Sequence, residues 1–287
     1  MPGSSLLWPC RCLRLHLLRP GCPGSPPARE EQFVFYWLLK YIFLGPILRL
    51  LYRPQVTGLE NVPNEGPVIL SINHNSFMDS LFLPLMVKRP VTFLAKDEYF
   101  VTPGFKGFWM KFFFTNVGQV PIDRSGGNAS EAALNTGVRV LSGGNMLGIY
   151  PEGTRTPDGK LYRGHTGVAR MALAANAVVV PVALHNTREV QPAGTKIPRV
   201  KKIGISIGKP LDFSRYEGME NDRFVLRSMT DEIMYEIMQL SDQEYSDIYA
   251  SKAKTLIAET GSSDPTTTKP ATGEGSAPTD SEAPASV

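Results

Sequence analysis

The sequence is poor in cysteine, and this shortage excludes several kinds of site. Only three of the 287 residues are cysteines, at positions 10, 12 and 22. The body of the chain can therefore hold neither a disulfide framework nor a thiolate zinc site, and it has no cysteine nucleophile. Long apolar runs are also scarce. A protein with several membrane spans needs several runs of about 20 apolar residues, so that class is excluded.

The chain has no large excess of charge of one sign. It carries 30 basic and 27 acidic residues, for a formal net charge of +3. The basic residues are dispersed and form no known nucleic-acid motif, so we expect no nucleic-acid partner. Residues 259–287 contain five acidic side chains and one lysine, a net charge of −4, which leaves +7 for residues 1–258. That basic balance suits an anionic ligand or a lipid surface.

The two ends differ in composition from the middle. Residues 1–31 combine proline, glycine and arginine with short apolar pieces, which do not form the uninterrupted core of a signal peptide. We predict a disordered leader there. Residues 259–287 are rich in Ser, Thr, Pro, Gly and Ala and are predicted to be a disordered acidic tail. Hydrophobic residues make up 42% of the chain, enough for one sizeable core in residues 56–258.

The most apolar stretch covers residues 33–52, within a predicted membrane-associating helical segment at 32–55. Its length approaches the roughly 20 residues of a membrane span. A helix pair that lies in the lipid headgroup region is favoured instead, because the stretch contains Lys40, Arg49 and a Gly45-Pro46 break. A buried helical hairpin and a true span are the alternatives. A second aromatic patch, at residues 105–114, fits either the core or a second membrane-facing surface.

Short apolar runs alternate with helical patterns through the rest of the body. Strands are predicted at residues 67–72, 91–95, 118–122, 146–150, 178–184 and 200–207. Helices are predicted at residues 78–87, 129–142, 167–175 and 222–240. This alternation predicts an α/β domain with a mixed, largely parallel sheet flanked by helices.

Polar residues with catalytic potential follow the first predicted strand. The segment at 73–79 reads N-H-N-S-F-M-D and leads into a helix. A turn would let Asp79 reach the imidazole of His74 and fix its tautomer, so that His74 could act as a general base. The simpler interpretation is a helix cap beside an incidental histidine. No further His or Cys lies nearby, so a metal site is not predicted.

Two more segments place anion-binding side chains after predicted strands. G-Q-V-P-I-D-R at 118–124 ends in Arg124, whose guanidinium suits a phosphate. Y-P-E-G-T-R at 150–155 offers a flexible glycine, a hydroxyl and a second guanidinium. Each segment alone also fits a surface turn with an incidental ion pair.

Taken in order, these segments resemble one known family. The chain is similar to the 1-acylglycerol-3-phosphate acyltransferases, also called lysophosphatidate acyltransferases, which belong to the glycerolipid acyltransferases. The resemblance covers about residues 56–207. It rests on N-H-x4-D at 73–79, G-x-V-P-I-D-R at 118–124, Y-P-E-G-T-R at 150–155 and V-V-P-V at 179–182.

The resemblance implies a glycerolipid acyltransferase fold and a specific reaction. Such enzymes move an acyl group from acyl-CoA or acyl carrier protein to the free hydroxyl of lysophosphatidate, which makes phosphatidic acid. His74 would be the base and Asp79 its orienting carboxylate. The implied substrate-binding residues are Asn73, Arg124, Glu152, Gly153, Thr154 and Arg155, with Arg124 on the acceptor phosphate. The family also implies membrane association, which we place on the cytoplasmic face.

The chemistry needs no further helper group. A thioester is already an activated acyl donor, so a base that deprotonates the acceptor is sufficient. We therefore predict no cofactor and no metal; acyl-CoA or acyl carrier protein is a co-substrate. Two alternatives remain. The same chemistry could serve glycerol 3-phosphate, another lysophospholipid or a glycolipid, or the protein could be a non-catalytic lipid binder.

Overall fold

A seven-stranded sheet forms the centre of the molecule, in the order β1-β8-β7-β2-β5-β3-β4. Its strands are β1 (Gln55–Thr57), β2 (Val68–Ile72), β3 (Val91–Lys96), β4 (Val120–Ile122), β5 (Met146–Ile149), β7 (Val178–His185) and β8 (Gly204–Ile207). β7, β2, β5, β3 and β4 are parallel, whereas β8 is antiparallel to β7 and pairs in parallel with β1. The mixed, largely parallel sheet predicted from the sequence is confirmed.

This arrangement is that of a computed structural model, which describes residues 29–96, 103–104, 107–108, 119–122, 129–192, 195 and 197–260. The remaining elements are α1 (Arg29–Leu38), α2 (Leu44–Tyr52), α3 (Asp79–Met86), α6 (Ala129–Ser142), α7 (Gly167–Ala174), α8 (Thr187–Val190), α9 (Arg223–Ser241) and α10 (Ala250–Thr260), with a small parallel sheet of β6 (Leu161–Tyr162) and β9 (Tyr245–Ser246). Short 3-10 turns cover Leu59–Asn61 and Ser214–Tyr216.

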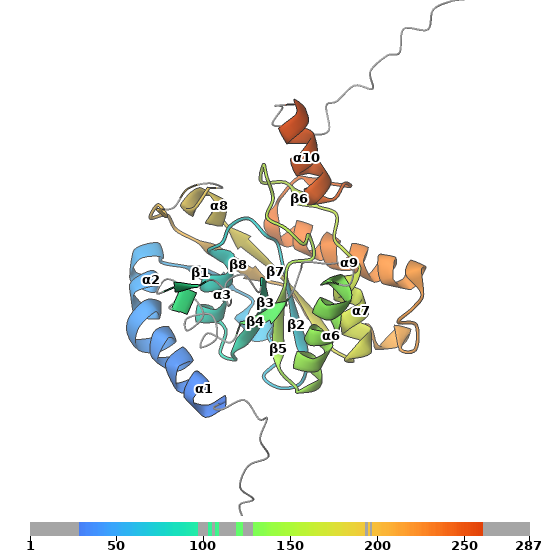
Figure 1. Ribbon diagram of the computed structural model, residues 1–287, viewed down its shortest axis with the longest axis horizontal. Coiled ribbons are helices and arrows are strands. Elements are labelled where there is room, and N and C mark those ends of the chain that lie inside the picture. Colours follow the sequence, from blue (N-terminus) through green and yellow to red (C-terminus); the bar gives the residue numbers. More distant parts are fainter. Residues whose placement is uncertain are drawn as a thin grey trace, which may run out of the picture.

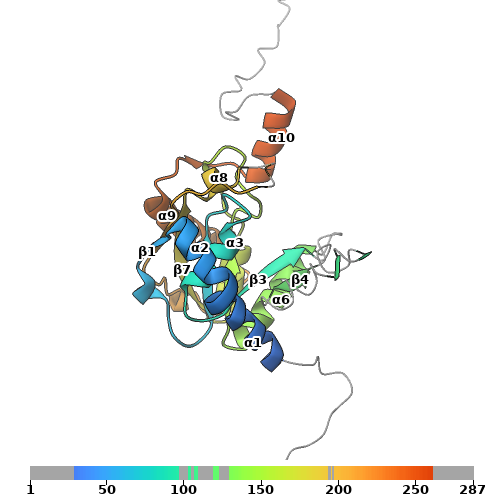
Figure 2. The same ribbon diagram turned by 90° about the vertical axis from the view of Figure 1, so that its left-hand side faces the viewer.

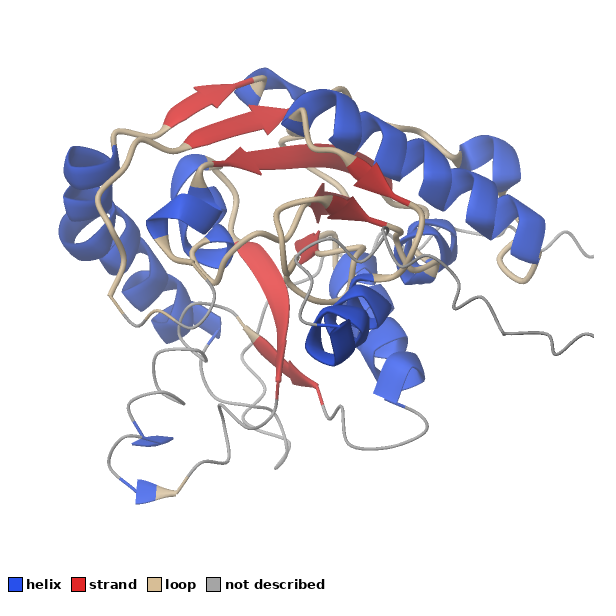
Figure 3. Ribbon diagram, turned by 90° about the horizontal axis from the view of Figure 1, so that it is seen from above, coloured by secondary structure: helices blue, strands red, loops and turns tan. Residues whose placement is uncertain are grey.

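Helices cover both faces of the sheet (Figures 1 and 3). The central strand β2 is buried along its whole length, as expected for a parallel strand that packs on two sides. Val68, Leu70 and Ile72 belong to a core with α2 and α3, while Ile69 belongs to a second core with α6, α7 and α9. This period of two divides the core into two layers, and the sheet holds them apart.

The N-terminal segment departs from the predicted helix pair. Residues 29–52 are helical throughout, because a π-helical turn at Leu39–Phe43 joins α1 to α2 without a loop (Figure 2). Pro46 lacks an N–H and its ring opposes the carbonyl four residues earlier, which explains a widened turn at this point. Gly45 fits there because a Cβ would lie 1.7 Å from the Lys40 carbonyl oxygen. The helix begins within the predicted leader, where residues 29–31 are helical.

Lys40 and Arg49, the two basic residues of the apolar stretch, both reach the C-terminal end of α3. The Lys40 ammonium is buried and donates to the Val87 carbonyl, and Arg49 donates to the Leu85 carbonyl at 2.7 Å. These carbonyls lie at the end of α3, where the helix dipole favours cations. Val34–Tyr52 is long and apolar enough to cross a membrane, and 22% of it is buried.

The sequence patterns find most of the central sheet and its flanking helices but miss several short elements and the 11-residue helix α10. α6 has the predicted bounds, and β8 is four residues shorter than predicted because residues 200–203 do not pair as a strand. No sequence pattern predicts β1, β6, β9, α8 or α10. α10 runs to Thr260, so the first two residues of the predicted tail are helical. The rest of the tail lies outside the described residues, as does most of the aromatic patch at 105–114.

Candidate active site

Two loops meet at the carboxyl ends of the central strands. One follows β2 and leads into α3, and the other follows β5. The His74 backbone N–H donates to the Glu152 carboxylate at 2.9 Å, and the Thr156 N–H donates to the His74 carbonyl at 2.8 Å. Adjacent parallel strands bring these loops together although 78 residues separate His74 from Glu152.

His74 and Asp79 form a hydrogen-bonded pair. The His74 Nδ1 lies 3.1 Å from Asp79 Oδ2, and the same oxygen accepts the N–H groups of Asn75 at 2.8 Å and Ser76 at 2.7 Å. Asp79 is fully buried at the first residue of α3, where the helix dipole favours its negative charge. A carboxylate only accepts hydrogen bonds, so Nδ1 carries the proton and Nε2 is left as the basic atom.

Tyr150 fixes the plane of the imidazole. Its ring stacks on His74 with centroids 3.8 Å apart and 14° between the planes. Its hydroxyl shares a 2.6 Å hydrogen bond with Ser80 on α3. Burial raises the pKa of the Tyr150 phenol well above its ordinary value, so the ring partner stays neutral. No role for Tyr150 or Ser80 is predicted from the sequence, because ring stacking and this hydrogen bond produce no recognisable motif.

Glu152 points into the protein. Its Oε1 accepts the His74 N–H, its Oε2 accepts the Tyr162 N–H at 3.0 Å, and only 2% of the residue is exposed. Burial raises the pKa of Glu152 to about 8, although the two backbone N–H groups act in the opposite direction. The geometry therefore makes Glu152 a clamp between the His74 loop and β6, not a wall of an open acceptor site.

Glu152→Gln is expected to flatten the pH dependence of stability. The carboxyl has a pKa of about 8 in the folded protein against an ordinary 4.5. The unfolded chain therefore releases this proton at lower pH, and the free energy of unfolding falls as the pH rises from about 4.5 to about 8. Thermal melts across this range should show a smaller decline for Glu152→Gln than for wild type. Glu60→Gln, at an exposed acid, is the control. Parallel declines for wild type and Glu152→Gln would contradict the assignment.

The Asn73 side chain also holds the loop in place through hydrogen bonds within the protein. Its amide bonds both the N–H and the carbonyl of Leu184 on β7, at 2.8 and 3.2 Å, and donates to the Gln243 side chain at 2.7 Å. Gln243 in turn donates to Asn75 at 3.1 Å and to the Gly159 carbonyl at 2.6 Å. The asparagines on either side of His74 thus share two partners, the Leu184 carbonyl and Gln243, which lies 170 residues from Asn73 and has no motif of its own.

The remaining predicted binding residues are more accessible. Gly153 is exposed and has φ +72°, a conformation that favours glycine. Thr154 is half-buried, and its hydroxyl accepts a hydrogen bond from the Lys254 ammonium at 2.5 Å. Arg155 is exposed. Arg124 lies outside the described residues, two positions beyond the end of β4.

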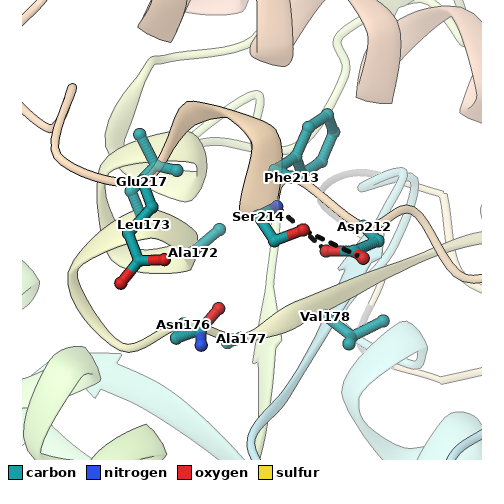
Figure 4. Close-up of a pocket in the computed structure, with 9 residues that line it drawn as sticks. All are labelled: Ala172, Leu173, Asn176, Ala177, Val178, Asp212, Phe213, Ser214 and Glu217. Atoms are coloured by element: carbon teal, nitrogen blue, oxygen red, sulfur yellow. Dashed lines mark hydrogen bonds between the residues drawn. The ribbon is translucent and has the colours of Figure 1, made fainter.

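Two other features of the molecule lie away from this site. The hollow in Figure 4 is lined by Phe213 and Val178, among others. Val178 is the first residue of β7, so this hollow lies at the amino ends of the strands, whereas His74 follows a carboxyl end. A G-x-S-x-G pattern, as in serine hydrolases, also occurs at residues 204–208, but it lies in and just after β8 and not in a strand-to-helix turn. Ser206 of this pattern bonds His185 in the neighbouring strand at 3.0 Å. Among the described residues, no three His, Cys, Asp or Glu side chains gather as metal ligands.

Comparison with known proteins agrees with this geometry. A family model described as Acyltransferase matches residues 53–185. The chain is 33% identical to a 1-acyl-sn-glycerol-3-phosphate acyltransferase of Pseudomonas aeruginosa, over 58% of this chain and 61% of that one. It is 27% identical to the enzyme of the same name from Bacillus subtilis, over 70% of this chain and 94% of that one.

Other relatives are longer, and one solved structure shares the fold. The chain is 29% identical to the chloroplastic 1-acyl-sn-glycerol-3-phosphate acyltransferase LPAT1 of Arabidopsis thaliana over 60% of this chain, and it spans about half of that protein (47%). The crystal structure of the acyltransferase PlsC from Thermotoga maritima matches with a TM-score of 0.54 at 24% identity, over 73% of this chain and 82% of that one. Residues 53–185 therefore form an acyltransferase-family domain, and the chain is similar to 1-acyl-sn-glycerol-3-phosphate acyltransferases of bacteria and plants.

Proposed function

We propose that the protein transfers a fatty acyl group from a thioester donor to the free hydroxyl of 1-acylglycerol 3-phosphate, making phosphatidic acid. The observation that carries this proposal is the His74–Asp79 pair, 3.1 Å apart at the carboxyl end of β2. The names of the relatives supply the acceptor, because each of them is called a 1-acyl-sn-glycerol-3-phosphate acyltransferase.

The pair supports direct transfer without an acyl-enzyme. The His74 Nε2 removes the proton of the acceptor hydroxyl while that oxygen attacks the thioester carbonyl. The new C–O bond forms, the C–S bond breaks, and the imidazolium returns its proton to the departing thiolate. Asp79 stabilises the imidazolium while it exists. Either acyl-CoA or acyl carrier protein fits this scheme, since both donors are thioesters.

The accessible residues of the loop after β5 supply the acceptor site. We assign the acceptor phosphate to Arg155 and Thr154, with Arg124 from the segment after β4 as a further donor. A guanidinium and a hydroxyl are suitable partners for phosphate oxygens. Glu152 and Asn73 act through the backbone and side chains that they hold, so they are positioning residues in this proposal.

The proposal is tested by thiol release from a long-chain acyl-CoA. Purified protein on phospholipid vesicles is supplied with lysophosphatidate, with glycerol 3-phosphate, or with no acceptor. Release that requires lysophosphatidate is the expected result. The assay is repeated with acyl carrier protein as donor. Release with glycerol 3-phosphate alone would assign the same chemistry to another acceptor, and no release with any donor and acceptor would favour the non-catalytic lipid binder.

The N-terminal helix provides the surface that would meet the lipid. Its outward face carries exposed apolar side chains at Val34, Leu38, Tyr41, Ile42, Phe43, Ile47, Leu50 and Leu51. No acidic residue occurs between positions 32 and 59. Lys40 is buried and bonds the Val87 carbonyl, whereas Arg49 is exposed and bonds the Leu85 carbonyl, so the outward face is mainly apolar with one basic residue beside it. We assign this face to the headgroup and acyl boundary of a bilayer.

Ile42→Gln combined with Leu50→Gln is expected to weaken vesicle binding. The two side chains are 61% and 73% exposed, so their replacement should leave the fold unchanged. Loss of two apolar side chains from the lipid should lower the partition coefficient by at least about tenfold. Co-flotation with phosphatidylglycerol-containing vesicles measures it. Phe224→Gln is the control, since Phe224 is 88% exposed on α9. Equal flotation of wild type, the double variant and Phe224→Gln would show that α1 and α2 do not contact the membrane.

A further inference from the structure

The C-terminal part of the chain, beyond the family match, packs beside the active-site loops. The match ends at residue 185, yet β9 pairs in parallel with β6, and α10 then stands beyond the carboxyl edge of the sheet (Figure 1). Tyr162 of β6 forms a small buried cluster with Ala250 and Ala253 of α10. This cluster determines which face of α10 is turned toward the domain.

Lys254 lies on that inward face of α10. Residues 250, 253 and 254 follow the spacing of three and four that places helical side chains on one side. The Lys254 ammonium donates to the Thr154 hydroxyl at 2.5 Å, across 100 residues of sequence. Lys254 is half-buried, whereas its neighbour Lys252 is exposed. The fold therefore delivers one particular lysine of α10 to the loop that follows β5.

The charge at this position is not neutralised. Among the ion pairs of the described residues, none includes Lys254 or Arg155. Burial and the nearby Arg155 both lower the pKa of Lys254, while Glu152 acts in the opposite direction. Both carboxylate oxygens of Glu152 accept backbone N–H groups, so this acid is not a direct partner. The Lys254 ammonium thus bonds the Thr154 hydroxyl while the Arg155 guanidinium lies close enough to act on its pKa, and neither cation has an ion-pair partner among the described residues.

We propose that Lys254 is a substrate-binding residue whose ammonium, together with Arg155 and the Thr154 hydroxyl, binds the phosphate of the lysophosphatidate acceptor. This inference rests on the proposed function, which supplies the acceptor. A phosphomonoester carries close to two negative charges and three acceptor oxygens at neutral pH, which matches two cations and a hydroxyl. The donor also contains phosphates, so the test separates the two substrates.

Lys254→Met is expected to raise the KM for lysophosphatidate about 10- to 100-fold, because it removes a charge-assisted hydrogen bond and keeps the length of the side chain. The KM for the acyl donor and kcat at saturating acceptor should change less than threefold. Lys254→Arg restores the charge and should recover much of the acceptor affinity. Lys252→Met is the matched control and should behave as wild type.

Three outcomes overturn the inference. An unchanged acceptor KM in Lys254→Met, when the wild type acylates lysophosphatidate, removes Lys254 from the site and leaves the proposed function intact. A raised donor KM with an unchanged acceptor KM assigns the lysine to the donor phosphates instead. A raised acceptor KM that Lys254→Arg does not lower at all points to packing of α10 and not to charge.

A binding measurement distinguishes failure of the inference from failure of the proposed function. Inorganic phosphate should raise the melting temperature of the wild type, compared with sodium chloride at equal ionic strength, and should raise that of Lys254→Met less. If this difference appears in a protein that does not acylate lysophosphatidate, the anion site stands and the proposed function fails. If phosphate stabilises both proteins equally, Lys254 does not bind the anion.

Discussion

His74→Ala is expected to abolish acyl transfer and leave the protein folded. The substitution removes the imidazole that Asp79 orients, which is the proposed base for the acceptor hydroxyl. General-base catalysis contributes about 10²–10⁴-fold, so turnover should fall by at least about 10³-fold once the loss of acceptor alignment is added. The side chain is 17% exposed, so its loss opens no large internal cavity. Thiol release with lysophosphatidate at saturating donor measures the effect.

A second histidine variant provides the control. His185 is the last residue of β7 and bonds Ser206, and it is not among the residues of the site. His185→Ala should retain turnover, while His74→Ala loses it, with both proteins giving the same circular dichroism as wild type. Turnover by His74→Ala within a few fold of wild type would exclude His74 as the base and would end the direct-transfer mechanism.

The parts of the fold that were predicted are those written in contiguous sequence. β2 is a run of five buried residues and α6 is a regular pattern that ends at a Gly-Gly pair, so local rules suffice for both. β6 and β9 are two residues long and exist because they pair across more than 80 residues. No window of sequence contains that pairing. For the same reason the sequence does not reveal Gln243 and Lys254, whose partners Asn73 and Thr154 are 170 and 100 residues away.

The site shows a different limit. The motifs name the residues that come together, but a motif does not state the direction of a side chain. Glu152 and Thr154 are two positions apart in one motif, yet the first holds two backbone N–H groups in the interior and the second meets a lysine near the surface. Their opposite roles follow from burial. The N-terminal helix shows the same limit, since its sequence does not reveal that Lys40 and Arg49 bond the end of α3 and the residue after it.

Asp79→Asn tests whether the carboxylate acts by charge or only by shape. Asp79 Oδ2 accepts three hydrogen bonds, from His74, Asn75 and Ser76. An asparagine with its carbonyl in this place keeps all three bonds and loses the negative charge that stabilises the imidazolium. If charge is the main contribution, transfer should fall about 10²–10⁴-fold with the loop still formed, as expected when the orienting acid of a His–Asp pair is neutralised.

The same variant carries a stability cost that can be measured separately. Asp79 Oδ1 is buried and has no hydrogen-bond partner among the described residues, so an asparagine would place an unsatisfied NH₂ group there. The expected loss is about 1–3 kcal/mol of unfolding free energy in urea titrations. Asp212→Asn, at an exposed aspartate by the hollow on the opposite edge of the sheet, is the control for the change of chemical type. A variant that loses this stability but keeps turnover would show that Asp79 only shapes the loop. A large loss of turnover in a protein that is still fully folded at the assay temperature would show that its charge takes part in catalysis.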